Sequence, residues 1–281
     1  MINVGFHASI AGGVDKAVDR VLERGCSTFQ IFTRNPRRWE FSALKPEEIK
    51  NFVEKVNQHN ISPIIAHMPY LPNLATPTEE LYARSCETLE KELERCAQLK
   101  IPYLVTHLGS HLGRGMENGI KRVSDLIDQA LFETQNVSVT ILLENTAGTL
   151  NSMGSTFGDI KSVIDRMYNK NRVALCFDTA HAFAAGYDLR TAEAIRKTLD
   201  HFDRVLGLER IKVIHLNDSK GDLRSGKDRH EHIGLGYIGE KGFRSFLEYE
   251  GLQDRPFILE TPLDNRRDDR GNIKRARELA E

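Results

Sequence analysis

The sequence predicts an α/β fold: a single-domain (β/α)8 TIM barrel. Three observations favour this class. Short apolar, β-branched runs recur along the chain and end in polar residues, as buried parallel strands do. Amphipathic helical patterns separate these runs, and strict alternation of strand and helix implies parallel strands joined by crossovers. The 281 residues suffice for one such barrel, which needs about 250, so we expect residues 1–281 to form one domain.

Each predicted strand is a short apolar run, and the eight runs lie at residues 2–7, 28–33, 63–68, 102–108, 139–146, 173–179, 211–217 and 256–261. Each predicted helix follows a strand, at residues 13–24, 46–60, 78–99, 117–133, 156–169, 191–206 and 239–249, with a short final helix near 272–280. The second helix has a typical start, because Pro46, Glu47 and Glu48 suit a first helical turn. Eight units close a barrel, whereas an open doubly wound sheet has about five or six strands.

The composition is that of an ordinary globular protein, with 40% hydrophobic residues, 28% charged residues and a net charge of −1. No stretch approaches the roughly 18 apolar residues of a membrane span, and the chain starts directly with a strand rather than with an export signal. The scattered Cys26, Cys86, Cys96 and Cys176 suit reduced, buried thiols. We therefore expect a cytoplasmic protein without membrane contact, and we expect a monomer.

The longest irregular segments all follow strands and so share one face of the predicted barrel, at residues 33–45, 69–77, 108–116, 218–238 and 262–271. Long loops in a compact domain are usually functional. Residues 34–38 contain three arginines and no acid, and residues 220–229 contain four basic residues. These loops either give a neutral protein a locally positive face or carry ordinary solvated charges.

Residues of the types that can bind metal lie at or just after the ends of six predicted strands: His67, His107, Glu144, Asp178 with His181, His215 and Glu260. Asp228 and His230 lie in the long loop 218–238. A single histidine at a strand end is ordinarily just a hydrogen-bonded polar residue, but chance would rarely repeat the pattern. Because the carboxyl ends of barrel strands meet at one face, where active sites of this architecture lie, we expect these side chains to converge there.

Five imidazoles and four carboxylates suit zinc, manganese or iron better than calcium or magnesium. Nine ligands are too many for one ion. If each ion has three to four protein ligands and one carboxylate bridges two ions, the nine ligands are enough for three ions. Clustered metals clamp phosphoryl oxygens and generate hydroxide near neutral pH, so the chemistry indicated is phosphoester hydrolysis.

These residues fall in motifs by which the whole chain resembles endonuclease IV, the metal-dependent family of abasic-site endonucleases. The motifs are His7-Ala8-Ser9, Phe32-Thr33-Arg34-Asn35, His67-Met68-Pro69-Tyr70-Leu71, Leu143-Glu144-Asn145-Thr146, Cys176-Phe177-Asp178-Thr179-Ala180-His181, His215-Leu216-Asn217-Asp218, Asp228-Arg229-His230 and Leu259-Glu260-Thr261-Pro262. They occur in order and at spacing like that of the family. Ala180 departs from the pattern, since many members have Cys there, but it is not a ligand.

The resemblance implies three Zn2+ ions per chain, with Mn2+ as a possible substitute. His67, His107 and Glu144 would hold the first ion, and Glu144 would bridge to a second held by Asp178, His215 and Glu260. The third ion would be held by His181, Asp228 and His230. Glu144 and Glu260 would be catalytic, with Glu144 positioning or deprotonating the attacking water.

The implied activity belongs to base excision repair of DNA. The partner would be double-stranded DNA that contains abasic sites or blocked 3′ ends. The family cleaves the phosphodiester on the 5′ side of an abasic site, leaving a 3′-hydroxyl and a 5′-deoxyribose phosphate, and it also trims blocked 3′ ends.

The resemblance also assigns DNA contacts to the loops. Arg37 matches a residue that enters the base stack, and Tyr70 and Leu71 match side chains that fill the gap of the missing base. Arg38 stands where Gln is common, so its contact with the orphan base would differ. The alternative for Tyr70 and Leu71 is packing on the barrel rim.

Two other functions remain open from the residues. A sugar isomerase or epimerase would share Glu144, Asp178, His215 and Glu260 around a single ion, but it needs none of the five other ligands. A catalytically silent binder of damaged DNA is the second alternative, although nothing in the sequence indicates a loss of chemistry.

Overall fold

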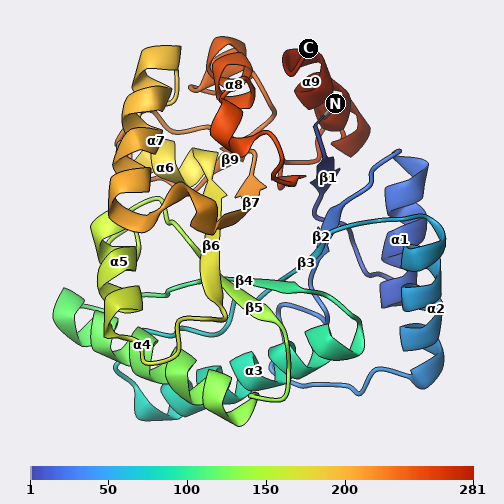
Figure 1. The fold of residues 1–281 in the computed structure, drawn as a ribbon, viewed down its shortest axis with the longest axis vertical. Helices are drawn as coiled ribbons and strands as arrows, with labels where there is room; N and C mark the ends of the chain where they lie inside the picture. Colours follow the sequence, from blue (N-terminus) through green and yellow to red (C-terminus); the bar gives the residue numbers. More distant parts are fainter. Residues whose placement is uncertain (1) are drawn as a thin grey trace.

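The computed structural model describes residues 2–281 and has the predicted barrel (Figure 1). Its parallel strands are β1 (Val4–Phe6), β2 (Phe29–Ile31), β3 (Ile64–His67), β4 (Tyr103–His107), β5 (Thr140–Glu144), β6 (Val173–Asp178), β7 (Ile211–His215) and β10 (Phe257–Leu259). Within residues 2–281 they form one eight-stranded sheet in the order β1-β10-β7-β6-β5-β4-β3-β2. Each strand lies inside a predicted run, so the expected fold is confirmed.

Closure of the barrel depends on a narrow seam between β1 and β2. In the described chain these two strands are joined by a single parallel bridge between His7 and Gln30. The backbone N–H of Ala8 donates to the Gln30 carbonyl at 2.7 Å. On its other side, β1 pairs with β10 through three residue pairs, beginning with Val4 and Phe257.

The helices surround the sheet on its outside (Figure 1). The predicted ones are α1 (Val14–Glu23), α2 (Pro46–Gln58), α3 (Glu79–Gln98), α4 (Met116–Glu133), α5 (Phe157–Arg166), α7 (Ala192–Leu206), α8 (Gly239–Leu247) and α9 (Asp269–Leu279). Helix α9 starts before the predicted residue 272 because the Asp268 side chain caps it, accepting from the Gly271 N–H at 2.8 Å. No helix of residues 2–281 is long and apolar enough to cross a membrane.

Five short elements were not predicted. Helix α6 (Thr179–Ala185) begins directly after β6, and the loop after β7 contains the antiparallel pair β8 (Asp218–Ser219) and β9 (His230–Glu231). Two 3-10 turns, Leu208–Arg210 and Glu250–Leu252, complete the set. The α6 segment is too short for a periodic pattern, and it begins where Asp178 accepts a hydrogen bond from the His181 N–H at 2.8 Å.

The barrel interior contains a small apolar layer that is separate from the larger core under the helices. It is formed by Ile65, Val105, Leu142, Ala174, Cys176, Val213 and Ile258. Successive side chains of a strand point to opposite faces, so residues two positions further along point inward again. For six of these seven residues, that next inward position is occupied by a candidate metal ligand.

Candidate metal centre

The strand period explains why distant parts of the chain supply one site. Two residues after the apolar layer come the ligands at or just after the ends of six different strands: His67, His107, Glu144, Asp178, His215 and Glu260. These side chains therefore form the next layer of the barrel interior, at its C-terminal face. His181 reaches the same place from the first turn of α6, and His230 reaches it from β9.

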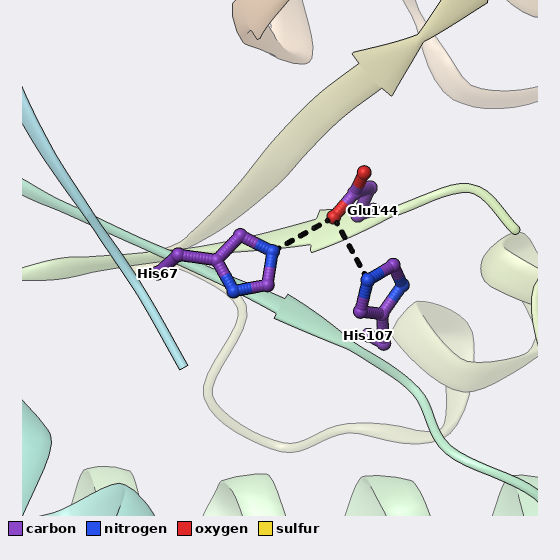
Figure 2. A group of neighbouring side chains, drawn as sticks. All are labelled: His67, His107 and Glu144. Carbon is purple, nitrogen blue, oxygen red and sulfur yellow. Dashed lines mark hydrogen bonds and ion pairs between the residues drawn. The ribbon is translucent and has the colours of Figure 1, made fainter. Parts of the chain in front are cut away.

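The first group joins His67, His107 and Glu144 (Figure 2). The Nε2 atom of His67 lies 3.2 Å from Glu144 Oε2, and that of His107 lies 3.5 Å from the same oxygen. His67 and Glu144 are buried, whereas His107 is partly exposed toward the barrel mouth.

The second group joins Glu144, Asp178, His215 and Glu260. The His215 Nδ1 atom lies 3.0 Å from Glu144 Oε1, 3.4 Å from Glu260 Oε2 and 3.9 Å from Asp178 Oδ2. Glu144 thus directs Oε2 to the first group and Oε1 to the second. A carboxylate divided in this way can bridge two ions.

The third group contains His181, His230 and Asp178. Asp228 lies at its edge, with Oδ1 3.2 Å from His181 Nε2 and 3.9 Å from His230 Nε2. The expected set of His181, Asp228 and His230 is therefore brought together. Asp178 joins it, with Oδ2 3.6 Å from His230 Nε2 and Oδ1 3.8 Å from His181 Nδ1. The Asp228 side chain is about half exposed, at 51%, because it comes from the loop between β8 and β9.

The hydrogen bonds of the histidines fit metal ligation. Three of them are set to donate one ring N–H to a backbone carbonyl through Nδ1: His67 to Met68 at 2.7 Å, His181 to Asn145 at 3.0 Å and His230 to Glu260 at 3.1 Å. A ring that is neutral and donates through Nδ1 presents its Nε2 lone pair to a carboxylate oxygen. Two acceptors face each other stably only when a proton or a metal cation lies between them, and a carbonyl partner of this kind is typical of metal-bound histidine. The buried His230 Nε2 has no hydrogen-bond partner among residues 2–281.

The electrostatics also favour a cationic occupant. Burial raises the pKa of Glu144, but His107 and His215 outweigh it and hold this pKa well below its usual value. The hydrogen bond from His181 lowers the pKa of Asp228 to about 2. Burial lowers the pKa of His181, but Asp178 and Asp228 raise this pKa by a larger amount. The pKa of His181 is therefore well above its usual value. The carboxylates are ionised and attract positive charge to the site.

Two asparagines that carried no predicted role hold the ligands in place. Asn217 donates to Asp178 Oδ2 at 2.8 Å, and its carbonyl accepts from the Glu260 N–H at 2.8 Å. Asn145 accepts from the Asp178 N–H at 2.8 Å. In the sequence they are marked by their place in two of the family motifs, one residue after Glu144 and two residues after His215.

A cavity of about 490 Å³ opens above the ligands. Its lining includes His67, His107, His181, Asp228, His230, Glu260 and the rim residue Tyr70. The Tyr70 side chain is 67% exposed and packs edge-on against the Phe32 ring, with centroids 5.1 Å apart. Leu71 is half-buried beside it, and Arg37 is exposed on the neighbouring loop.

The interpretation of Arg34 as an exposed loop charge is wrong. Arg34 is buried, and its Nε donates to Glu92 Oε1 on α3 at 2.7 Å. Thr33 donates to Glu92 Oε2 at 2.5 Å, and Arg95 donates to the Thr33 carbonyl at 2.6 Å. This buried cluster fixes the base of the loop, so Arg37 and Arg38 alone of its three arginines face solvent.

Comparison with known proteins identifies the family. A family model described as a xylose isomerase-like TIM barrel matches residues 18–281. A protein named probable endonuclease 4, from Methanoculleus marisnigri, is 53% identical over 280 residues that cover 100% of this chain and 99% of the relative. The chain belongs to the endonuclease IV family. The crystal structure of endonuclease IV from Thermus thermophilus is similar throughout, with 38% identity, a TM-score of 0.88 and coverage of 99% of this chain and 98% of that one.

Sugar-converting enzymes share the fold at much lower identity. A D-tagatose 3-epimerase-like protein has a TM-score of 0.74 and 17% identity, with coverage of 99% of this chain and 95% of that one. At that identity the likeness shows the fold alone. Membership of the endonuclease IV family confirms the expectation of a metal-dependent hydrolase over that of a sugar isomerase.

Proposed function

We propose that this enzyme repairs DNA by cleaving the phosphodiester on the 5′ side of abasic sites in duplex DNA. The products would be a 3′-hydroxyl and a 5′-deoxyribose phosphate, and the same site would trim blocked 3′ ends. We infer that it acts as a monomer in the cytoplasm. The observation that carries the proposal is the division of the Glu144 carboxylate between two groups of ligands.

We assign the metal positions by these groups. His67, His107 and Glu144 would hold the first ion, and Glu144, Asp178, His215 and Glu260 would hold the second. His181, His230 and Asp228 would hold the third, with Asp178 beside them. The imidazole-rich donor set favours Zn2+, with Mn2+ as a substitute.

When bound, the ions would supply hydroxide near neutral pH and neutralise charge on the leaving 3′-oxygen. Glu144 lies between the groups and would position the attacking water and accept its proton at a carboxylate oxygen. Glu260 would be a ligand of the second ion, together with Glu144, Asp178 and His215. The half-exposed Asp228 is the ligand nearest to solvent in the third group, and it would face the departing sugar oxygen.

Recognition of the lesion would use the rim. An abasic nucleotide leaves the helix at low cost, because no base pair has to be broken. Tyr70 and Leu71 would fill the gap that the missing base leaves, and Arg37 would enter the stack from the adjacent loop. The exposure of Tyr70 supports this role. A large aromatic side chain at a loop tip is costly to leave in water, and a base stack would cover it.

The test combines metal analysis with cleavage. Purified protein should contain close to three transition-metal ions per chain, mainly zinc, and should cut a duplex with one abasic site immediately 5′ to the lesion. A chelator should abolish cutting. One ion per chain with all nine ligands intact would favour a sugar isomerase, and tight binding of abasic duplex without cleavage by the metal-loaded protein would favour a silent binder.

A further inference from the structure

Gln30 lies inside the barrel, although none of the metal-binding motifs contains it. It belongs to β2, its side chain is fully buried, and its carbonyl closes the seam with β1. Its amide lies between two ligands of the second metal group that come from other strands. Gln30 Oε1 is 2.9 Å from His215 Nε2, and Gln30 Nε2 is 2.7 Å from Glu260 Oε1.

The donors and acceptors fix how this amide is oriented. An ionised carboxylate only accepts hydrogen bonds, so the NH2 end of Gln30 must face Glu260. The carbonyl end then faces His215, which has to donate from Nε2. The proton of a neutral His215 therefore lies on Nε2, and the lone pair lies on Nδ1. Nδ1 is the atom that faces Glu144, Asp178 and Glu260.

The same amide determines which carboxylate oxygen of Glu260 remains available to a metal ion. Oε1 of this carboxylate accepts from Gln30 and lies 3.2 Å from His7 Nδ1, while Gln30 Nε2 also lies 3.0 Å from that His7 atom. Oε2 is left to face His215 Nδ1 at 3.4 Å. One buried amide thus directs a nitrogen and an oxygen toward the same metal position.

We propose that Gln30 is a positioning residue that sets the tautomer of His215 and the orientation of Glu260, and thereby the affinity of the second metal position. The inference rests on the proposed metal centre. Partners that orient metal ligands typically change metal affinity or activity by about 10–100-fold when they are replaced. Gln30 is rigidly held for this task, since its backbone takes part in closure of the barrel.

The test uses Gln30→Met, which keeps the length of the side chain and removes all three polar contacts. Gln129→Met, on the exposed side of α4, is the matched control. Zinc affinity is measured ion by ion by competition with a chelator, and kcat and KM are measured on abasic duplex. We expect one of the three ions to bind about 10–100-fold more weakly. We also expect kcat to fall with KM unchanged, and Gln129→Met to behave as the parent.

A second variant separates positioning from packing. Gln30→Glu keeps the shape of the side chain and the acceptor for His215, but as a carboxylate it cannot donate to Glu260. It should therefore also weaken one ion selectively, while repulsion between the two buried carboxylates lowers the thermal midpoint of the zinc-free protein. Parent-like affinity for all ions in both variants would overturn the role of Gln30 and leave the proposed function standing. A parent protein without zinc would overturn both. Equal weakening of all three ions in Gln30→Met would indicate a general packing role and refute the inference.

Discussion

Replacing Glu92 by Gln should destabilise the protein far more than replacing Glu87 on the same helix. Glu92 is fully buried and accepts from Arg34 and Thr33, while the Arg34 side chain is 3% exposed. Glu92→Gln leaves the Arg34 charge buried without a counter-charge, and breaking a buried pair in this way costs about 3–5 kcal/mol. Glu87 pairs with Lys91, but the two side chains are 60% and 43% exposed, and such surface pairs contribute at most about 1 kcal/mol.

The assay is urea unfolding of the variants as purified, with equal metal content. Circular dichroism reports on the barrel, and the fluorescence of Trp39, the only tryptophan, reports on the loop 33–45. Trp39 stacks against the Arg84 guanidinium at 4.4 Å, so release of the loop should change its emission. The Glu92→Gln variant should lose about 3 kcal/mol or more of unfolding free energy, and its Trp39 transition should precede the barrel transition. Equal losses for Glu92→Gln and Glu87→Gln would refute the reasoning that this cluster holds the loop.

Two other predictions concern the metal ligands and the rim. Glu260→Gln and His107→Ala should each cut cleavage of abasic duplex strongly while circular dichroism stays unchanged, because each disturbs a group that contains Glu144; near-parental cleavage by either variant would make that assignment wrong. Replacing Tyr70 and Leu71 together by Ala should weaken binding of abasic duplex by about 1–3 kcal/mol per aromatic contact, roughly one to two factors of ten. Metal content and binding of undamaged duplex should change little, and an equal loss on both duplexes would indicate that these residues support the rim.

The fold and the convergence of the ligands were predictable because both follow from local patterns. An apolar run that ends in His67 or Glu144 indicates a buried strand. It also shows at which end of that strand the polar side chain lies. The short helix after Asp178 and the pair of two-residue strands around Asp228 have no such periodic pattern. They are stabilised by contacts that form only once the barrel is present.

Side chains whose role depends on a distant partner escaped prediction for the same reason. Arg34 stands beside exposed arginines in the sequence, and nothing near it indicates that Glu92 neutralises it. Gln30 is one polar residue within an apolar run, and its partners come from strands some 185 and 230 positions later. Sequence periodicity shows which side of a strand is buried, but it does not show which polar groups meet there.

The pairing of β1 with β10 has a consequence for synthesis of the protein. Val4 pairs with Phe257, so β1 cannot pair with β10 until most of the chain has left the ribosome. Glu260 follows the same late strand. Contacts so distant in sequence are slow to form, and the early strands leave an open sheet edge until then. A ribosome that stalls just before residue 257 therefore carries a barrel that lacks only its last strand and is still open, and such an intermediate is a natural substrate for chaperones.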